Sequence, residues 1–272
     1  MNRVLCELGH DSHEVELINV CLRGQPVVRE YPAIPDHLAT EFSMWVYKHV
    51  GYEGAQGYCP ARDDVCLSLE KNRIWEGYET LLALEIFHCG DRSQIVLDFG
   101  AQLGWYSLLA AKAGYWTLAF DAYEENLKHL WNSAVVNKLD HTIMPVCLWL
   151  DEKTTPARFN WKNDNVLFLK ADVEGAEEHV IRHCWQLIKD RKVQYLLLEI
   201  SPCFNNSYLQ IMLDLWKAGY DAFLVPSKPS KEVRDSFSAG PLGAIQDCLI
   251  CPGDYAPFIA DTYQENVLFI RR

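Results

Sequence analysis

A glycine loop with an acid at its first position is the strongest chemical signal in the sequence. Segment 96–104 reads Val-Leu-Asp-Phe-Gly-Ala-Gln-Leu-Gly and contains Asp98, Gly100, Ala101 and Gly104. Between a strand and a helix, such a loop brings a pyrophosphate against the helix N-terminus in dinucleotide sites. A carboxylate at position 98 would repel a diphosphate, but it suits the positively charged amino end of S-adenosylmethionine. The loop therefore favours S-adenosylmethionine as the cofactor.

A second acid follows at a spacing that is typical of ribose recognition. Asp121 ends the next apolar run, 23 residues after Asp98. A carboxylate at this place accepts hydrogen bonds from both ribose hydroxyls, and NAD sites use the same device. Either acid alone would equally suit a helix cap or a solvated turn, and the two glycines alone would suit a tight turn without a ligand. Together, the acids and glycines predict a cofactor site.

A third polar group follows a later apolar run and reads Lys170-Ala-Asp172-Val-Glu174-Gly-Ala-Glu-Glu. We expect Asp172 or Glu174 to lie beside the transferring methyl group, where it orients an acceptor hydroxyl or accepts its proton. Lys170 is an alternative base or an electrostatic partner. The same acids would also suit a helix N-terminus that Asp172 caps. A metal held by paired carboxylates is a further alternative, but we assign no metal ligand.

The elements that must position these residues alternate along the chain. Apolar runs predict strands at 93–98, 115–121, 142–148, 166–172, 193–200, 220–225 and 265–271, the last paired antiparallel with the sixth. Helices are predicted at 105–112, 124–137, 174–188 and 206–218, and a polar loop at 151–165 between the third and fourth strands. Strands that are separated by helices pair in parallel through right-handed crossovers. The pattern predicts an α/β fold with a doubly wound, mostly parallel, seven-stranded sheet, which binds ligands at the carboxyl ends of its strands.

The flanking regions are less regular. We expect residues 1–70 to form an N-terminal extension or a small cap subdomain, with a hairpin made by 14–22 and 27–31. A helix is expected around 75–87, and residues 226–243, which contain three prolines, are expected to form a long loop. Aromatic residues before position 76 offer stacking faces for a sugar ring or else belong to the core: Trp45, Tyr47, Tyr52, Tyr58 and Trp75.

Composition narrows the classes of partner. The chain of 272 residues carries 25 Lys and Arg against 37 Asp and Glu, a formal net charge of -12, which argues against duplex nucleic acid as a partner. No apolar run approaches the roughly 18 residues of a membrane span, and the first residues lack the apolar core of a signal peptide. The ten cysteines are expected to be reduced thiols, because no targeting sequence is evident. A zinc site is not expected, because the Cys248 and Cys251 pair lacks a second pair of ligands nearby. These features predict a cytoplasmic protein without a membrane span.

Four motifs in a fixed order resemble one family of enzymes. They are Asp98-Phe-Gly-Ala-Gln-Leu-Gly-Trp-Tyr-Ser, Ala119-Phe-Asp-Ala-Tyr-Glu-Glu-Asn, Leu169-Lys-Ala-Asp-Val-Glu-Gly-Ala-Glu and Leu198-Glu-Ile. Together they resemble the FkbM family of S-adenosylmethionine-dependent methyltransferases, over about residues 73–200. The resemblance implies a Rossmann-like, class I methyltransferase domain over 71–272. It also implies methylation of a hydroxyl on a sugar, a glycolipid or a polyketide.

The same resemblance implies further site residues and shows departures. By the family pattern, Glu76 reaches the cofactor from just before the core, and a surface helix position is the alternative. The family usually reads Glu-Pro where this chain has Asp121 and Ala122, so the ribose carboxylate is kept but a rigid turn is lost. Gln102 stands where Asn is usual, which affects contacts to the amino acid end of the cofactor.

The leading hypothesis is O-methyl transfer from S-adenosylmethionine to a small-molecule or glycan acceptor, without duplex nucleic acid. Positioning supplies much of the rate, and a carboxylate or Lys170 assists the loss of the proton. One alternative is an NAD-type oxidoreductase on a similar sheet, which Asp98 opposes. Another is a non-catalytic binding protein with a methyltransferase fold, which the intact Asp98, Gly100, Gly104 and Asp121 oppose. The sequence does not specify the oligomeric state.

Overall fold

The computed structural model describes residues 15–24, 31–47, 64–151, 165–203, 207–227 and 230–272. Its main sheet has the order β5-β4-β3-β6-β7-β10-β8-β9, and a separate hairpin pairs β1 (Val15–Leu22) with β2 (Thr40–Tyr47). The strands of the main sheet are β3 (Ile95–Phe99), β4 (Trp116–Asp121), β5 (Ile143–Cys147), β6 (Val166–Ala171), β7 (Val193–Ile200), β8 (Tyr220–Leu224), β9 (Leu249–Ile250) and β10 (Glu265–Arg271). Strands β3 to β7 pair in parallel, whereas β10 is antiparallel to both β7 and β8.

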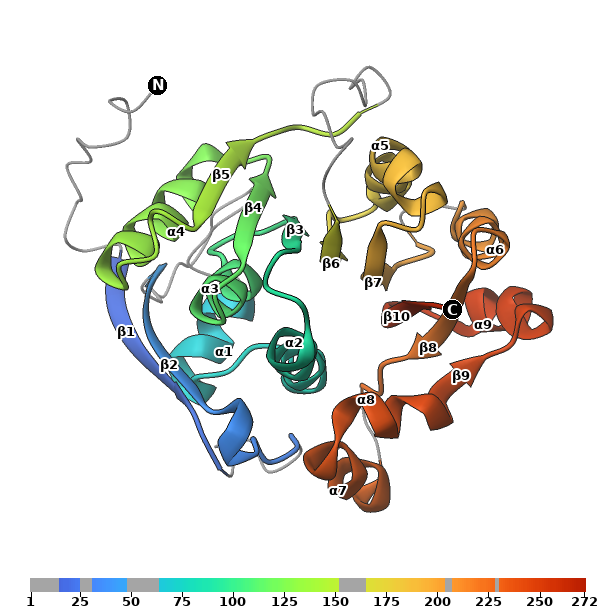
Figure 1. Ribbon diagram of the computed structural model, residues 1–272, viewed down its shortest axis with the longest axis horizontal. Coiled ribbons are helices and arrows are strands. Elements are labelled where there is room, and N and C mark those ends of the chain that lie inside the picture. Colours follow the sequence, from blue (N-terminus) through green and yellow to red (C-terminus); the bar gives the residue numbers. More distant parts are fainter. Residues whose placement is uncertain (1–14, 25–30, 48–63, 152–164, 204–206, 228–229) are drawn as a thin grey trace, which may run out of the picture.

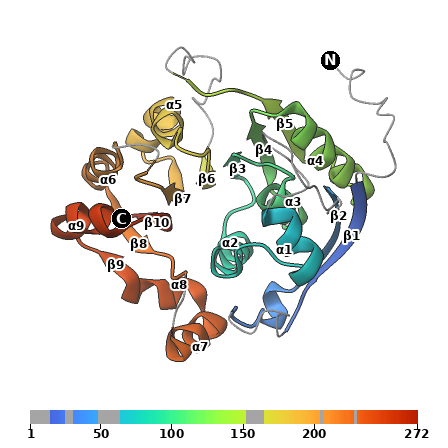
Figure 2. The same ribbon diagram turned by 180° about the vertical axis from the view of Figure 1, so that it is seen from behind.

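Helices cover both faces of the sheet (Figure 1). They are α1 (Asp64–Asn72), α2 (Gly77–Cys89), α3 (Trp105–Lys112), α4 (Glu124–Val136), α5 (Glu177–Lys189), α6 (Tyr208–Lys217), α7 (Lys231–Ala239), α8 (Pro241–Ala244) and α9 (Tyr255–Asp261). One core cluster joins the sheet to α2, α3, α4 and the β1–β2 hairpin, and a second joins the other face to α5, α6 and α9 (Figure 2). All six residues of β6 are buried, as expected for a central parallel strand covered on both faces.

The predicted doubly wound, mostly parallel sheet is confirmed, and each of its seven predicted strands is present. The two-residue strand β9 extends the sheet beyond the prediction by pairing antiparallel with β8. The predicted loop at 226–243 is wrong where the structure describes it, because 231–239 forms α7 and 241–244 forms α8. The predicted helices at 75–87 and 206–218 correspond to α2 and α6.

The first strand has a partner that the sequence analysis did not predict. Strand β1 pairs over its whole length with β2, at 40–47. The partner predicted for it, at 27–31, lies mostly outside the described residues. Alternate residues of β2, namely Phe42, Met44 and Val46, are buried, so the hairpin turns one apolar face inward. Aromatic residues Tyr52 and Tyr58 also lie outside the described residues.

The hairpin packs directly on the main body. Backbone N–H groups of Ser43 and Trp45 donate to the side chains of Asn137 and Ser133 at the end of α4, both at 2.9 Å. The division into residues 1–70 and 71–272 stays a prediction, and this boundary falls within α1. In the part of the chain that the structure describes, no helix combines the length and the apolar character that crossing a bilayer requires.

The pairing register brings polar residues to one edge of the sheet. Phe99 lies opposite Ala171, and Ala171 lies opposite Leu198, so β3, β6 and β7 end nearly level. Strand β10 runs the other way, and its second residue, Asn266, lies opposite Glu199. The carboxyl edge of the sheet therefore collects Gly100, Asp172, Glu199 and Asn266.

Candidate active site

The glycine loop lies close to the end of β6 and to α4, and these close contacts exclude a side chain at Gly100 and at Gly104. Gly100 has φ 79°, and a Cβ built there would lie 1.6 Å from the carbonyl oxygen of Asp172. Backbone N–H groups of Gly100 and Ala101 both donate to the carbonyl of Phe120 at 2.9 Å. At Gly104, φ is 89° and a Cβ would lie 2.1 Å from Leu130 of α4. These contacts leave no room for a side chain at either position, so the turn between β3 and α3 needs both glycines.

Asp98, within β3, is almost fully buried but only half paired. Its Oδ2 atom accepts a hydrogen bond from the Ser107 hydroxyl at 2.6 Å. Its Oδ1 atom is buried and has no hydrogen-bond partner among the described residues. Burial raises the pKa of Asp98, and the nearby Lys170 opposes that rise. Because an unpaired buried acceptor is costly, this oxygen fits a ligand that brings a hydrogen-bond donor, such as an ammonium group.

Asp121, at the end of β4, has a different environment. Its Oδ2 atom accepts from the backbone N–H of Gln102, and its Oδ1 atom accepts from the backbone N–H of Tyr123, each at 2.8 Å. The side-chain amide of Asn126 also donates to Oδ1, at 3.3 Å. Burial raises the pKa of Asp121, and these donors oppose the rise. The carboxylate holds the loops after β3 and β4 together, and its contact with a ribose stays a prediction.

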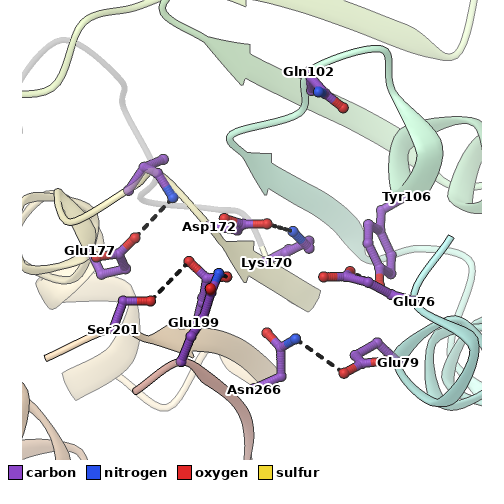
Figure 3. A network of polar contacts seen from close by, with 12 residues as sticks. Glu76, Glu79, Gln102, Tyr106, Lys170, Asp172, Glu177, Glu199, Ser201 and Asn266 are labelled. Carbon is purple, nitrogen blue, oxygen red and sulfur yellow. Dashed lines mark hydrogen bonds and ion pairs between the residues drawn. The ribbon is translucent and has the colours of Figure 1, made fainter. Parts of the chain in front are cut away.

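Beyond the glycine loop, the sheet edge carries a network around Lys170 (Figure 3). The buried ammonium of Lys170 lies 2.6 Å from Oδ2 of Asp172 and 4.9 Å from the centre of the Tyr106 ring. The hydroxyl of Tyr106 donates to Oε2 of Glu76 at 2.6 Å. Burial alone would lower the pKa of Lys170, but the carboxylates of Asp172, Glu76 and Asp98 outweigh burial and raise it above its usual range. Lys170 is therefore a fixed cation and a poor base.

Two further carboxyls adjoin this network. Glu199 accepts from the hydroxyl of Ser201 at 3.3 Å and from the amide of Gln264, while Asn266 donates to Glu79 at 3.1 Å (Figure 3). Burial raises the pKa of both glutamates to about 8, and the neighbouring carboxylates, Asp172 for Glu199 and Glu76 for Glu79, add to the rise. Both groups are therefore neutral over much of the physiological pH range.

In the turn after β6, the acids of segment 170–178 have different environments. Asp172 pairs with Lys170, and no side chain caps α5, so the capping role predicted as an alternative for Asp172 is wrong. Glu174 is exposed and has a left-handed backbone with φ 53°. Glu177 instead shapes the turn, because it accepts from the backbone N–H groups of Val173 and Gly175 and from the Tyr208 hydroxyl.

The structure thus brings Glu76, Asp98, Lys170 and Asp172 into one network, while Asp121 and Ala122 lie two strands from Lys170, at the end of β4. Sequence reasoning missed five polar residues at or beside this network: Glu79, Tyr106, Glu177, Glu199 and Asn266. For Glu199 a signal existed, because an acid near the end of a buried apolar strand lies at the binding edge of a parallel sheet. For Asn266 the signal was the antiparallel direction of β10, which places its first residues at that edge.

The order of the sheet, with the antiparallel strand β10 inserted between β7 and β8, defines the protein as a Rossmann-like fold of the class I methyltransferase type. No protein-family model and no curated protein matches the chain. Membership of the FkbM family is therefore not confirmed.

Among solved structures, an rRNA methylase from Streptococcus thermophilus is 11% identical, over 73% of this chain and 98% of that one, with a TM-score of 0.47. A precorrin-6y C5,15-methyltransferase from Geobacter metallireducens is 12% identical over 73% and 91% of the two chains, with a TM-score of 0.42. The [4+2]-cyclase SpnF is 13% identical over 73% and 84%, with a TM-score of 0.44. These similarities concern the fold alone.

The comparisons correct the prediction about partners. The prediction of a small-molecule or glycan acceptor, without duplex nucleic acid, is contradicted, because the similar solved structures include an rRNA methylase. The physical reason is that a formal net charge of -12 is a property of the whole chain and does not describe the charge of one face.

Proposed function

We propose that the protein is an S-adenosylmethionine-dependent methyltransferase. The observation that carries this proposal is the buried Oδ1 atom of Asp98, which has no hydrogen-bond partner among the described residues and lies in the strand that leads into the glycine loop. A carboxylate with a free acceptor position suits the amino group of the cofactor. When bound, the cofactor supplies an electrophilic methyl group on a sulfonium centre.

The chain's own residues take three roles in this proposal. Asp98 and Glu76 bind the positively charged amino end of the cofactor, and Gly100 lets the loop after β3 pass close to the backbone of Asp172. Asp121 orders the loop at the ribose end and has acceptor capacity left for a hydroxyl, because a carboxylate offers about four acceptor positions. Lys170 holds the Asp172 carboxylate in place, through their 2.6 Å ion pair, at the edge where the acceptor enters.

The charge of the edge supports this cofactor over NAD. Glu76, Asp98 and Asp172 all act electrostatically on Lys170, which is the one cation that the structure describes within the network. The ammonium of Lys170 is already paired with Asp172. A pyrophosphate would therefore meet carboxylates without a free counter-charge, whereas a cationic ligand would relieve their repulsion.

We further propose that the acceptor attacks the methyl group through a hydroxyl. We also propose that the protein is a member of the FkbM family. A hydroxyl must lose its proton during attack, and carboxylates at the edge can accept it. Asp172 is partly exposed, so it is placed to contact an acceptor above β6, whereas the buried and largely neutral Glu199 beside it is not suited to accept a proton. Glu174 is exposed and lies outside the network around Lys170, and we propose that it contacts the acceptor.

The first experiment is calorimetric titration of the protein with S-adenosylhomocysteine, with NADH in parallel. We expect binding of the adenosyl ligand in the micromolar range and no response to NADH, because the site favours a cation over a diphosphate. Absence of any response to S-adenosylhomocysteine would contradict the proposal. Binding without turnover on any acceptor would favour the non-catalytic alternative.

A second experiment tests the acceptor atom. The protein is incubated with methyl-labelled S-adenosylmethionine and with pools of hydroxylated metabolites, glycans and RNA, and the methylated products are identified by mass spectrometry. We expect the label on an oxygen atom. Label found only on nitrogen or carbon would overturn the hydroxyl proposal but leave the cofactor proposal intact.

A further inference from the structure

One contact of the N-terminal region lies directly beside Glu76, at Gly77, which begins α2. A Cβ built at Gly77 would lie 2.4, 2.6 and 2.7 Å from three ring atoms of Tyr31. The ring of Tyr31 therefore covers the backbone of Gly77 so closely that no side chain fits between them. Tyr31 lies 46 positions earlier in the sequence, so this contact ties a distant segment to the start of α2.

The residue that precedes Gly77 has an unusual backbone. Glu76 has φ 43° and ψ 72°, in the left-handed region that residues other than glycine rarely adopt. A residue at this position before a helix normally has an extended backbone. Glu76 can remain left-handed only if its surroundings hold it there, and such strain is found mainly at functional sites.

Contacts from three directions hold this backbone. Behind Glu76, the carbonyl of Trp75 accepts from the Thr80 hydroxyl at 2.6 Å, and the indole of Trp105 donates to the same hydroxyl oxygen at 2.8 Å. At its side chain, the Tyr106 hydroxyl donates to Glu76 at 2.6 Å. Ahead of it, the Tyr31 ring blocks movement of Gly77. The first two groups of contacts come from α2 and α3, and only the Tyr31 contact comes from the N-terminal region.

Tyr31 is itself anchored. Its ring makes an edge contact with Tyr78, with centroids 6.4 Å apart, and Tyr78 makes another with Phe237 of α7 at 5.3 Å. Two residues on, the backbone N–H of Ala33 donates to the hydroxyl of Ser238 at 2.9 Å. The ring is therefore fixed between α2 and α7 and can act as a rigid stop.

We infer that Tyr31 is a positioning residue for the cofactor: by covering Gly77, it holds the left-handed backbone of Glu76 and aims the Glu76 carboxylate at the site beside Lys170 and Tyr106. This inference rests on the proposed function, because it requires Glu76 to contact the amino end of the cofactor. Its consequence is that the N-terminal region completes the cofactor site.

The experiment is a double-mutant cycle of S-adenosylhomocysteine affinity, measured by calorimetry on wild type, Tyr31→Ala, Glu76→Ala and the double variant. We expect Glu76→Ala to weaken binding about tenfold or more, because a charge-assisted hydrogen bond is lost. Tyr31→Ala should weaken it several-fold, since Glu76 relaxes toward an extended backbone. In the Glu76→Ala background, Tyr31→Ala should have no further effect.

Two more variants separate positioning from folding. Tyr31→Phe keeps the ring and should bind like wild type. Tyr31→Ala combined with Gly77→Ala fills part of the space that the ring leaves, so it should fold as well as wild type in thermal melting and still bind weakly. Two results would overturn the inference. One is wild-type affinity for S-adenosylhomocysteine in this folded double variant. The other is a loss of affinity on Tyr31→Ala that is as large in the Glu76→Ala background as in wild type. If wild type itself does not bind, the proposed function fails first.

Discussion

Asp98 and Asp121 end neighbouring strands on either side of the glycine loop, yet their carboxylates are used differently. Asp121 accepts three hydrogen bonds from Gln102, Tyr123 and Asn126, all within the loops that it joins. Asp98 accepts one, from Ser107, and its second oxygen is buried without a partner among the described residues. From the sequence, both acids are expected to contact the cofactor. In the structure, Asp121 bonds the loops after β3 and β4, whereas Asp98 keeps one acceptor position without a partner among the described residues.

This difference shows that the role of an acid at a strand end does not follow from its position in the sequence. The number of donors that the protein itself supplies separates a residue that shapes the site from one that waits for a ligand. A substitution of each acid should therefore move different quantities: stability for Asp121 and ligand affinity for Asp98.

The largest effect is expected for Asp121→Ala. Two backbone N–H groups and one amide lose their acceptor, and leaving buried donors unpaired costs about 1–3 kcal/mol each when no water reaches them. We expect the free energy of unfolding, measured by urea denaturation, to fall by about 2–4 kcal/mol in total. Replacement of the exposed Asp140 by Asn serves as the control. Stability equal to wild type would show that Asp121 does not hold the loops.

Asp98→Asn should show the opposite pattern. The amide has nearly the same shape and its oxygen can still accept from Ser107, but its buried NH2 group has no acceptor, so we expect the free energy of unfolding to fall by about 1–2 kcal/mol, less than for Asp121→Ala. The affinity for S-adenosylhomocysteine should fall about tenfold or more, because a charge-assisted hydrogen bond becomes a neutral one. Calorimetry and urea denaturation on the same samples give both numbers. An unchanged affinity would break the contrast with Asp121.

A further expectation concerns pH and two buried glutamates, Glu79 and Glu199. Burial raises the pKa of each to about 8 from its ordinary value of 4.5, so the native state binds more protons than the unfolded state between these values. The free energy of unfolding should therefore fall as pH rises from about 5 to 9.

We expect Glu199→Gln to flatten this decline, because the amide cannot ionise. Thermal melts across this pH range measure it, and the exposed Glu178→Gln is the matched control. A wild-type stability that rises with pH, or an identical slope in Glu199→Gln, would contradict the expectation.

Much of the sheet was predictable because its strands are buried apolar runs bounded by turn residues. Strand β2 was missed although Phe42, Met44 and Val46 alternate, since a nearer apolar segment was taken as the partner of β1. Helix α7 was missed because its residues are mostly polar and only Phe237 is buried. The side chain of Ser230 accepts from the backbone N–H of Val233 there, a capping signal that the nearby prolines concealed.

The site was predictable only where it follows the chain locally. Asp98, Asp121 and Lys170 lie at strand ends, and strand ends can be found from periodicity. The contacts of Tyr106 with Glu76 and of Asn266 with Glu79 join residues 30 and 187 positions apart, and no local pattern encodes them. Likewise, the aromatic residues before position 76 were considered as faces for a sugar ring, whereas Tyr31, which was not among them, covers Gly77.

The position of β10 has a consequence for synthesis of the protein on the ribosome. This strand lies between β7 and β8, although it is translated about 40 residues after β8 ends. At typical elongation rates of about 5–20 residues per second, the two earlier strands wait on the order of seconds for the strand that joins them. During that time β7 and β8 each present an unpaired, largely apolar edge, which invites pairing with other chains. The nascent protein therefore depends on protection, by chaperones or by delayed collapse, until its sheet can close.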